Sequence, residues 1–352
     1  MNAGSSLAAL GWTPELDEAF TTSTAGRHGF WPARVVAEHR GGYAVRGERG
    51  DRLASVRTRW RDEHETVGGM PAVGDWVVAV EAPRERAAIE AVLPRRTKVS
   101  RKTPWLKAEE HVLVANVDTV FLVSGLDADF NVRRLERYLV AAWDSGADPV
   151  VVLTKLDVCD DPLKPVAAEA VAIGVPVVTL SALTGEGLDA LEPWLVPTKT
   201  VVLLGSSGVG KSTLINRLAG RELMPVGDLR RDGKGRHMTR HRQLLVIRGG
   251  ALLIDTPGLR ELQVWEGDVD AAFADIAALA AQCRFNDCSH TAEPDCAVRE
   301  HVEPERLASY FKLQRELART SARANSRMHR ELKRRWRERS REVKQLRRRG
   351  LL

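Results

Sequence analysis

Gly-Ser-Ser-Gly-Val-Gly-Lys-Ser-Thr, residues 205–213, is the stretch around which this chain of 352 residues is organised. An apolar run at 201–204 leads into it, and helix-forming residues at 214–219 follow it. Strand, glycine-rich loop and helix in this order form the context in which the pattern G-x-x-x-x-G-K-[ST] binds phosphate. The loop turns backbone N–H groups toward phosphate oxygens, and the helix N-terminus adds its positive end. The alternative, a glycine-rich turn before an ordinary helix, is disfavoured by both flanks.

Within this loop, Lys211 is expected to contact the β- and γ-phosphates as a catalytic cation, and Ser212 to ligate Mg²⁺. The fourth loop position is Gly208 rather than asparagine, so we expect no dependence on potassium. The residues predicted to bind phosphate are Gly205, Ser206, Ser207, Gly208, Val209, Gly210, Lys211, Ser212 and Thr213.

The tetrapeptide Thr-Lys-Leu-Asp at 154–157 follows an apolar strand and favours guanine over adenine. Asp157 can accept hydrogen bonds from both the ring N1–H and the exocyclic amine of guanine, which adenine does not offer in that arrangement. Lys155 can lie across the base and brace the loop. A second loop, at 181–183, follows the next strand, where a backbone N–H can meet guanine O6. The predicted base-binding residues are Thr154, Lys155, Asp157, Ser181 and Ala182.

Asp255 begins an Asp-Thr-Pro-Gly sequence directly after the apolar residues 251–254. We expect Asp255 to hold Mg²⁺, directly or through water, and the N–H of Gly258 to sense the γ-phosphate. Thr239 lies in a long polar loop at 221–243 and is expected to complete the Mg²⁺ shell as an order–disorder switch. The predicted Mg²⁺ ligands are Ser212, Thr239 and Asp255.

The order of these motifs is unusual. The two loops expected to contact the base, at 154–157 and 181–183 (the base-reading loops), precede the phosphate loop at 205–213, whereas in ordinary GTPases they follow it. Joining the old termini and reopening the chain at a surface loop keeps the same sheet. Alternating strands and helices from about 112 predict a doubly wound, mostly parallel α/β sheet with its ligand at the carboxyl ends of the strands. Short glycine-punctuated strands from 29 to about 96 predict a small antiparallel barrel, of the oligonucleotide-binding or the SH3-like kind.

Three cysteines and a histidine follow within fourteen residues in the pattern C-x4-C-x-H-x5-C. Three thiolates and one imidazole suit tetrahedral Zn²⁺, and without a fifth ligand the site is expected to be closed and structural. Buried free thiols are the alternative. The predicted ligands of one zinc per chain are Cys283, Cys288, His290 and Cys296.

Charge is unevenly distributed along the chain. Residues 321–350 carry 13 Lys/Arg against 3 Glu, whereas the rest carries 40 basic and 44 acidic residues. A basic block on a near-neutral body favours a polyanionic partner, usually nucleic acid, over a solvated helix. The sequence has no apolar run of membrane-spanning length and no signal pattern, so we expect a cytoplasmic monomer without a membrane partner.

The permuted order, the Gly-Arg-His stretch at 235–237 and the cysteine run resemble the ribosome small subunit-dependent GTPase A (RsgA) family over about residues 30–315. The resemblance implies an oligonucleotide-binding barrel, a permuted GTPase and a C-terminal zinc module. It also implies GTP hydrolysis to GDP, stimulated by the small ribosomal subunit during late maturation, with rRNA as a partner. The family's switch loop usually reads Gly-Arg-His-Thr-Thr-Thr, whereas here Met238 and Arg240 flank a single Thr239.

On these grounds we divide the chain into five parts. They are a flexible lead at 1–28, a barrel at 29–97, a GTPase domain at 98–268, a zinc-binding module at 269–320 and a basic helical tail at 321–352.

The residue after Gly258 is Leu259, where many GTPases place a water-orienting glutamine. Intrinsic hydrolysis should therefore be slow, and His237 is the best internal catalytic candidate, as the resemblance also implies. Alternatively, His237 hydrogen-bonds RNA or backbone. Two other functions remain open: an RNA-binding protein whose GTP site is only a structural or regulatory switch, and an ATP-driven P-loop enzyme acting on nucleic acid.

Overall fold

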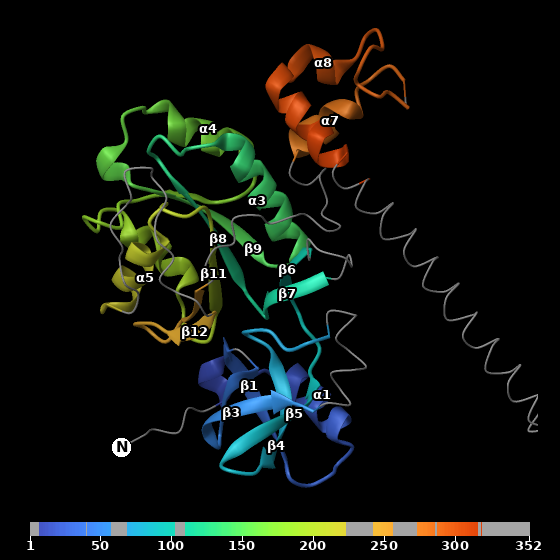
Figure 1. Cartoon of the computed structure of the whole chain (residues 1–352). Helices are drawn as coiled ribbons and strands as arrows, with labels where there is room; N and C mark the ends of the chain where they lie inside the picture. Colours follow the sequence, from blue (N-terminus) through green and yellow to red (C-terminus); the bar gives the residue numbers. More distant parts are fainter. Residues whose placement is uncertain are drawn as a thin grey trace, which may run out of the picture.

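The computed structural model describes residues 7–39, 41–57, 69–102, 110–222, 242–255, 273–285, 287–315 and 318. Among these residues, no helix is both long enough and apolar enough to cross a membrane. Figure 1 shows a barrel, a central α/β unit and a small helical module arranged in that order.

The barrel consists of β1 (Phe30–His39), β2 (Gly42–Gly47), β3 (Gly50–Val56), β4 (Trp76–Ala82) and β5 (Arg86–Val92). Strand β1 pairs with both β2 and β4, which closes the sheet, and β3 pairs with β5 in parallel. Four of the five strands contain a strand-like run expected from sequence, at 33–36, 43–45, 76–80 and 87–92. The exception is β3, because the polar residues in its first half break the apolar pattern by which a strand is recognised in sequence.

The N-terminal segment differs from the expected loose lead at 1–28, because its described residues fold. Residues Leu7–Leu10 form a 3₁₀ helix (η1) and Pro14–Thr24 form α1. Leu10 is buried, and the Trp12 ring meets Trp76 of β4 edge-on, with 4.8 Å between ring centroids. Two short helices carry too few apolar residues for a periodic signal, so this order comes from packing on the barrel.

The central sheet has the order β10-β9-β8-β11-β13-β12, and all neighbours are parallel except β12 and β13. Its strands are β8 (Thr119–Gly125), β9 (Asp148–Thr154), β10 (Val177–Thr179), β11 (Thr200–Leu204), β12 (Gln243–Val246) and β13 (Leu252–Asp255). Both faces are buried: α3 (Val132–Asp144) and α4 (Leu163–Val171) contribute to one apolar cluster, and α5 (Lys211–Ala219) and the 3₁₀ helix η4 (Leu188–Trp194) to the other. The predicted doubly wound α/β sheet is thus confirmed.

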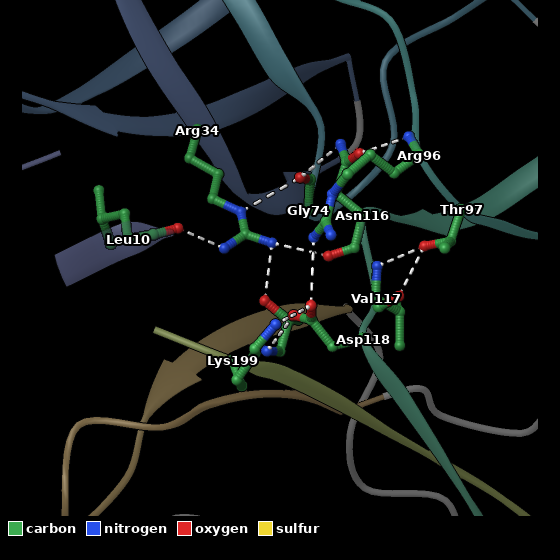
Figure 2. A network of polar contacts seen from close by, with 10 residues as sticks. Leu10, Arg34, Gly74, Arg96, Thr97, Asn116, Val117, Asp118 and Lys199 are labelled. Carbon is green, nitrogen blue, oxygen red and sulfur yellow. Dashed lines mark hydrogen bonds and ion pairs between the residues drawn. The ribbon is translucent and has the colours of Figure 1, made fainter. Parts of the chain in front are cut away.

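The barrel and the central sheet are continuous, since Ala37 of β1 pairs with Gln243 of β12. Arg34, fully buried in β1, reinforces this junction (Figure 2). Its guanidinium donates to the carbonyls of Leu10, Gly74 and Asn116. The basic segment at 95–102 contains strand β6 (Lys98–Lys102), which pairs with β7 (Glu110–Ala115) in a separate two-stranded sheet.

The C-terminal module contains α7 (Ala274–Ala280), α8 (Ala297–His301) and a helical stretch at 304–315. It packs against α3, whose Val140 lies in the apolar cluster of the module (Figure 1). Arg306 holds this contact: it bonds Glu136 of α3 at 2.7 Å and Asp275 of α7 at 2.7 Å. The Ser309 hydroxyl donates to the second Glu136 oxygen, so both oxygens of this buried carboxylate accept hydrogen bonds from the module.

Candidate functional site: a phosphate loop beside a base-reading loop

The predicted nucleotide residues gather at one edge of the central sheet. Strands β10, β9, β8, β11 and β13 are parallel neighbours, so their carboxyl ends lie side by side. The base-reading loops leave β9 and β10, the phosphate loop leaves β11, and Asp255 ends β13. In an open α/β sheet this edge is where ligands bind.

The phosphate loop has the backbone that its glycines permit. Gly208 and Gly210 adopt positive φ angles of 84° and 93°, and Gly210 caps α5. A Cβ on Gly205 would lie 2.3 Å from the Val123 carbonyl oxygen of β8, so close strand packing excludes any side chain there. The Lys211 ammonium folds back over the loop and donates to the carbonyls of Gly205 at 2.8 Å and Ser206 at 2.5 Å. The predicted strand–loop–helix context is confirmed.

Thr154 connects the base-reading loop to the phosphate loop. Its buried hydroxyl donates to the Val209 carbonyl at 2.5 Å. This bond fixes the two halves of the predicted site relative to each other, although they are 55 residues apart in sequence.

The two base-reading loops also contact each other. The Ser181 hydroxyl donates to Asp157 Oδ1 at 2.5 Å, and the Leu156 N–H donates to the Leu180 carbonyl at 3.2 Å. Asp157 therefore has one oxygen engaged by Ser181, an arrangement that orients its carboxylate. Ala182 of the second loop is buried, and its carbonyl accepts a hydrogen bond from Arg217 of α5 at 3.1 Å.

Arg217 and Asp127 are two residues that sequence reasoning missed. Arg217 ties α5 to the loop at 182–183, and Asp127 pairs with Lys155. Asp127 follows the end of β8, so the rule that ligands meet strand ends would have pointed to it. Arg217 carried no sequence signal, because it looks like any basic residue on a helix.

Several predicted residues lie outside the part of the chain that the structure describes. They are His237, Thr239, Gly258 and Leu259, together with the basic tail from 321 onward. Of the predicted Mg²⁺ ligands, the described ones are Ser212, in the first turn of α5, and Asp255, buried at the end of β13. Ser212 follows the phosphate loop that leaves β11, and β13, which Asp255 ends, is the parallel neighbour of β11, so both residues belong to the same edge of the sheet. Hydroxyl and carboxylate oxygens are the kind of ligand that Mg²⁺ takes.

The four predicted zinc ligands meet in space. Their ligand atoms all lie within 4.8 Å of one another. Cys283 Sγ lies 3.9 Å from Cys296 Sγ and 3.6 Å from His290 Nδ1, and Cys296 Sγ lies 3.5 Å from the same nitrogen. Sulfurs at the usual bond length of about 2.3 Å from one tetrahedral centre lie about 3.8 Å apart, so the cluster matches this geometry.

Local backbone around the cluster explains how so short a segment closes. His290 and Asp295 adopt positive φ angles of 57° and 56°, which turn the chain back between the ligands. Cys296 caps α8, where its Sγ accepts from the Arg299 N–H at 3.5 Å. Cys283 follows shortly after the end of α7, so two of the thiols are placed by short helices. The fourth cysteine, Cys159, lies apart from the cluster, close to the base-reading loop at 154–157.

The phosphate loop follows β11, whereas the base-reading loops follow β9 and β10, which come earlier in the chain. This arrangement defines a circularly permuted P-loop GTPase. The family model of the RsgA GTPase matches residues 92–265. The chain is 50% identical, over 89% of its length and 90% of the relative, to the small ribosomal subunit biogenesis GTPase RsgA of Opitutus terrae. It is 49% identical, over 81% of its length and 83% of the relative, to RsgA 2 of Lactiplantibacillus plantarum. The chain belongs to the RsgA family.

Solved structures agree on the fold. The crystal structure of YjeQ from Thermotoga maritima matches with a TM-score of 0.57 and 29% identity, covering 82% of this chain and 99% of that one. YloQ, described as a circularly permuted GTPase, matches with a TM-score of 0.56, covering 83% of this chain and 96% of that one. At 24% identity the second likeness concerns the fold alone. The family, the barrel and the permuted α/β core predicted from sequence are thereby confirmed.

Proposed function

We propose that this protein hydrolyses GTP to GDP and phosphate as a late assembly factor of the small ribosomal subunit, which stimulates its activity. The observation that carries the proposal is the Thr154–Val209 hydrogen bond, which joins the base-reading loop at 154–157 to the phosphate loop in one site. The names of relatives at 45–50% identity support the assignment to the small subunit.

In this proposal the chain's own groups bind and orient the nucleotide. Asp157, oriented by Ser181, accepts from the N1–H and the amine of guanine, and Lys155 lies across the base. The backbone N–H groups at 205–213 and the N-terminus of α5 surround the phosphates. The Lys211 ammonium exchanges the carbonyls of Gly205 and Ser206 for phosphate oxygens.

Ser212 and Asp255 are the described residues that would hold Mg²⁺, with Thr239 as a third ligand. When bound with GTP, Mg²⁺ would neutralise charge on the β- and γ-phosphates. His237 is proposed as the group that compensates for Leu259. Its position in the sequence, in the segment that precedes β12, is compatible with this role.

We further propose one structural zinc per chain, held by Cys283, Cys288, His290 and Cys296. With four protein ligands the centre is closed, and it fastens a module that has only a small apolar cluster of its own. The barrel, the zinc module and the basic residues after 320 are the proposed contacts with rRNA in the cytoplasm, and the protein is proposed to act as a monomer.

A GTPase assay titrated with purified small subunits tests the proposal. We expect slow turnover by the protein alone, a rise that saturates as small subunits are added, and no rise with large subunits. Turnover that stays flat would favour the second candidate, an RNA-binding protein whose GTP site is only a switch. The observation in favour of that candidate is Leu259, because its apolar side chain cannot orient a water molecule for attack. Competition by ATP as effective as that by GTP would favour an ATP-driven enzyme instead.

A further inference from the structure

Asp127 and Lys155 form an ion pair at the edge of the proposed guanine pocket. Lys155 Nζ lies 2.5 Å from Asp127 Oδ2, and the two side chains are 23% and 29% exposed. Lys155 belongs to the base-reading loop after β9, whereas Asp127 comes two residues after the end of β8. The register of the two strands, Gly125 opposite Thr154, brings them together.

The loop that carries Asp127 is fixed by several bonds. The Leu126 N–H donates to the Thr154 carbonyl at 2.9 Å. The Lys164 ammonium donates to the carbonyls of Leu126 at 3.1 Å and Asp127 at 3.4 Å. These bonds hold the Asp127 backbone beside the base-reading loop independently of any nucleotide.

Gly125 makes room for the pair. A Cβ at this position would lie 2.9 Å from Asp127 Oδ1 and 3.4 Å from Lys155 Cδ. Any larger residue would therefore press on the Asp127 carboxylate and come into contact with the Lys155 side chain. The absence of a side chain at 125 is thus matched to the approach of Asp127 and Lys155.

We propose that Asp127 is a positioning residue for guanine recognition, which anchors the Lys155 ammonium so that the aliphatic part of Lys155 forms one wall of the base pocket. The inference rests on the proposed guanine site. The backbone of Lys155 is already fixed in the left-handed region, with φ at 62°, so its long side chain is the remaining freedom. A tethered side chain loses less conformational entropy when the base binds than a free one does.

Electrostatics agree with a persistent pair. Burial opposes ionisation of Asp127, but the hydrogen bond and charge of Lys155 outweigh it, together with backbone N–H groups at 127 and 129. The net effect lowers the pKa of Asp127, so the carboxylate is charged throughout the neutral range.

The test measures binding of fluorescent mant-GDP by the full-length chain and its variants. Because the pair is partly exposed, Asp127→Asn should weaken binding by about two- to fivefold. Asp129→Asn is the matched control: Asp129 lies in the same loop but pairs with Arg134 at 2.9 Å, and affinity should be unchanged. Asp127→Glu keeps the charge and should retain more affinity than Asp127→Asn.

A double-mutant cycle with Lys155→Met separates positioning from a structural role. If Asp127 acts through Lys155, Asp127→Asn should add no further loss once Lys155 is methionine. A loss that persists in the Lys155→Met background would overturn the inference, as would an Asp127→Asn variant with native affinity. A native chain that binds no guanine nucleotide would overturn the proposed function as well, so the two failures can be told apart.

Discussion

Arg34 in barrel strand β1 donates a hydrogen bond to the Thr200 hydroxyl at the start of β11, with 2.9 Å between nitrogen and oxygen. Strand β11 ends at the phosphate loop, so a buried cation of the barrel is bonded to the strand that carries the nucleotide site. Burial lowers the pKa of Arg34 to about 10, and the charges of Asp118 and Asp75 partly offset this effect. The side chain still carries its charge at neutral pH, and its donors meet oxygens of Leu10, Gly74, Asn116 and Thr200. The first three of these partners are labelled in Figure 2.

We predict that Arg34→Met lowers the free energy of unfolding by about 3 kcal/mol, because buried oxygens lose their donor. Arg49→Met is the control, since Arg49 makes an exposed pair with Glu81 and should change stability by less than about 1 kcal/mol. Chemical denaturation followed by circular dichroism measures both. Equal midpoints for the two variants would contradict a structural role for Arg34.

Asp157→Asn should weaken GTP binding roughly a hundredfold, because one hydrogen bond to a charged acceptor becomes a bond to a neutral amide oxygen and the other is replaced by two N–H donors that face each other. Binding of xanthosine nucleotides should improve relative to GTP, since asparagine can donate to the xanthine 2-oxo group. Asp189→Asn, an exposed carboxylate in the first turn of η4, serves as the control. Competition titrations with GTP, XTP and ATP decide the matter, and equal native affinity for ATP and GTP would refute guanine selectivity.

Lys211→Ala and Ser212→Ala should each abolish GTP hydrolysis while leaving the melting temperature close to native. Both residues are only partly buried, so their removal empties no core position. Leu214→Ala, in the same helix but fully buried, should instead lower stability by about 3 kcal/mol. Turnover assays and thermal melts of the three variants separate the effects. Native turnover in either loop variant would mean that the phosphate site lies elsewhere.

Freshly purified protein should contain one zinc per chain by elemental analysis. Cys283→Ala and Cys296→Ala should lose or weaken it, whereas Cys159→Ala should keep a full equivalent. Structural zinc contributes on the order of 10 kcal/mol to small folds, so chelation should loosen the module at 273–315. Protection of its amides in hydrogen exchange reports this directly. Zinc-free native protein would count decisively against the metal site.

Deleting 321–352 should flatten the dependence of RNA or small-subunit affinity on salt. Each phosphate contact contributes a log–log slope of roughly −0.7 to −0.9, so four to six contacts predict a change of about three to five units. Basal GTP hydrolysis should hardly change, because every nucleotide motif precedes this segment. Subunit-stimulated hydrolysis should fall at physiological salt and partly recover at low salt. A truncated protein with the native salt slope would show that the tail has another task.

Local chemistry made much of the candidate site predictable from the sequence. The phosphate loop, the Thr-Lys-Leu-Asp tetrapeptide and the Cys3His cluster each place their functional groups within a few residues of one another. Phosphate, base and metal therefore constrain short stretches directly. The apolar runs likewise marked β9 and β11, because strands buried on both faces are continuously hydrophobic.

Tertiary structure alone decided what distant segments do together. Four contacts join residues between 24 and 206 positions apart in the sequence. They are the pairing of Ala37 with Gln243, the hydrogen bonds of Arg34 to Leu10 and Thr200, and the Asp127–Lys155 ion pair. An exposed arginine and a buried one look alike in sequence, and the two short helices at 7–24 gain their order only from the barrel beneath them. Such features depend on the free energy of packing between elements, which no local pattern of residues encodes.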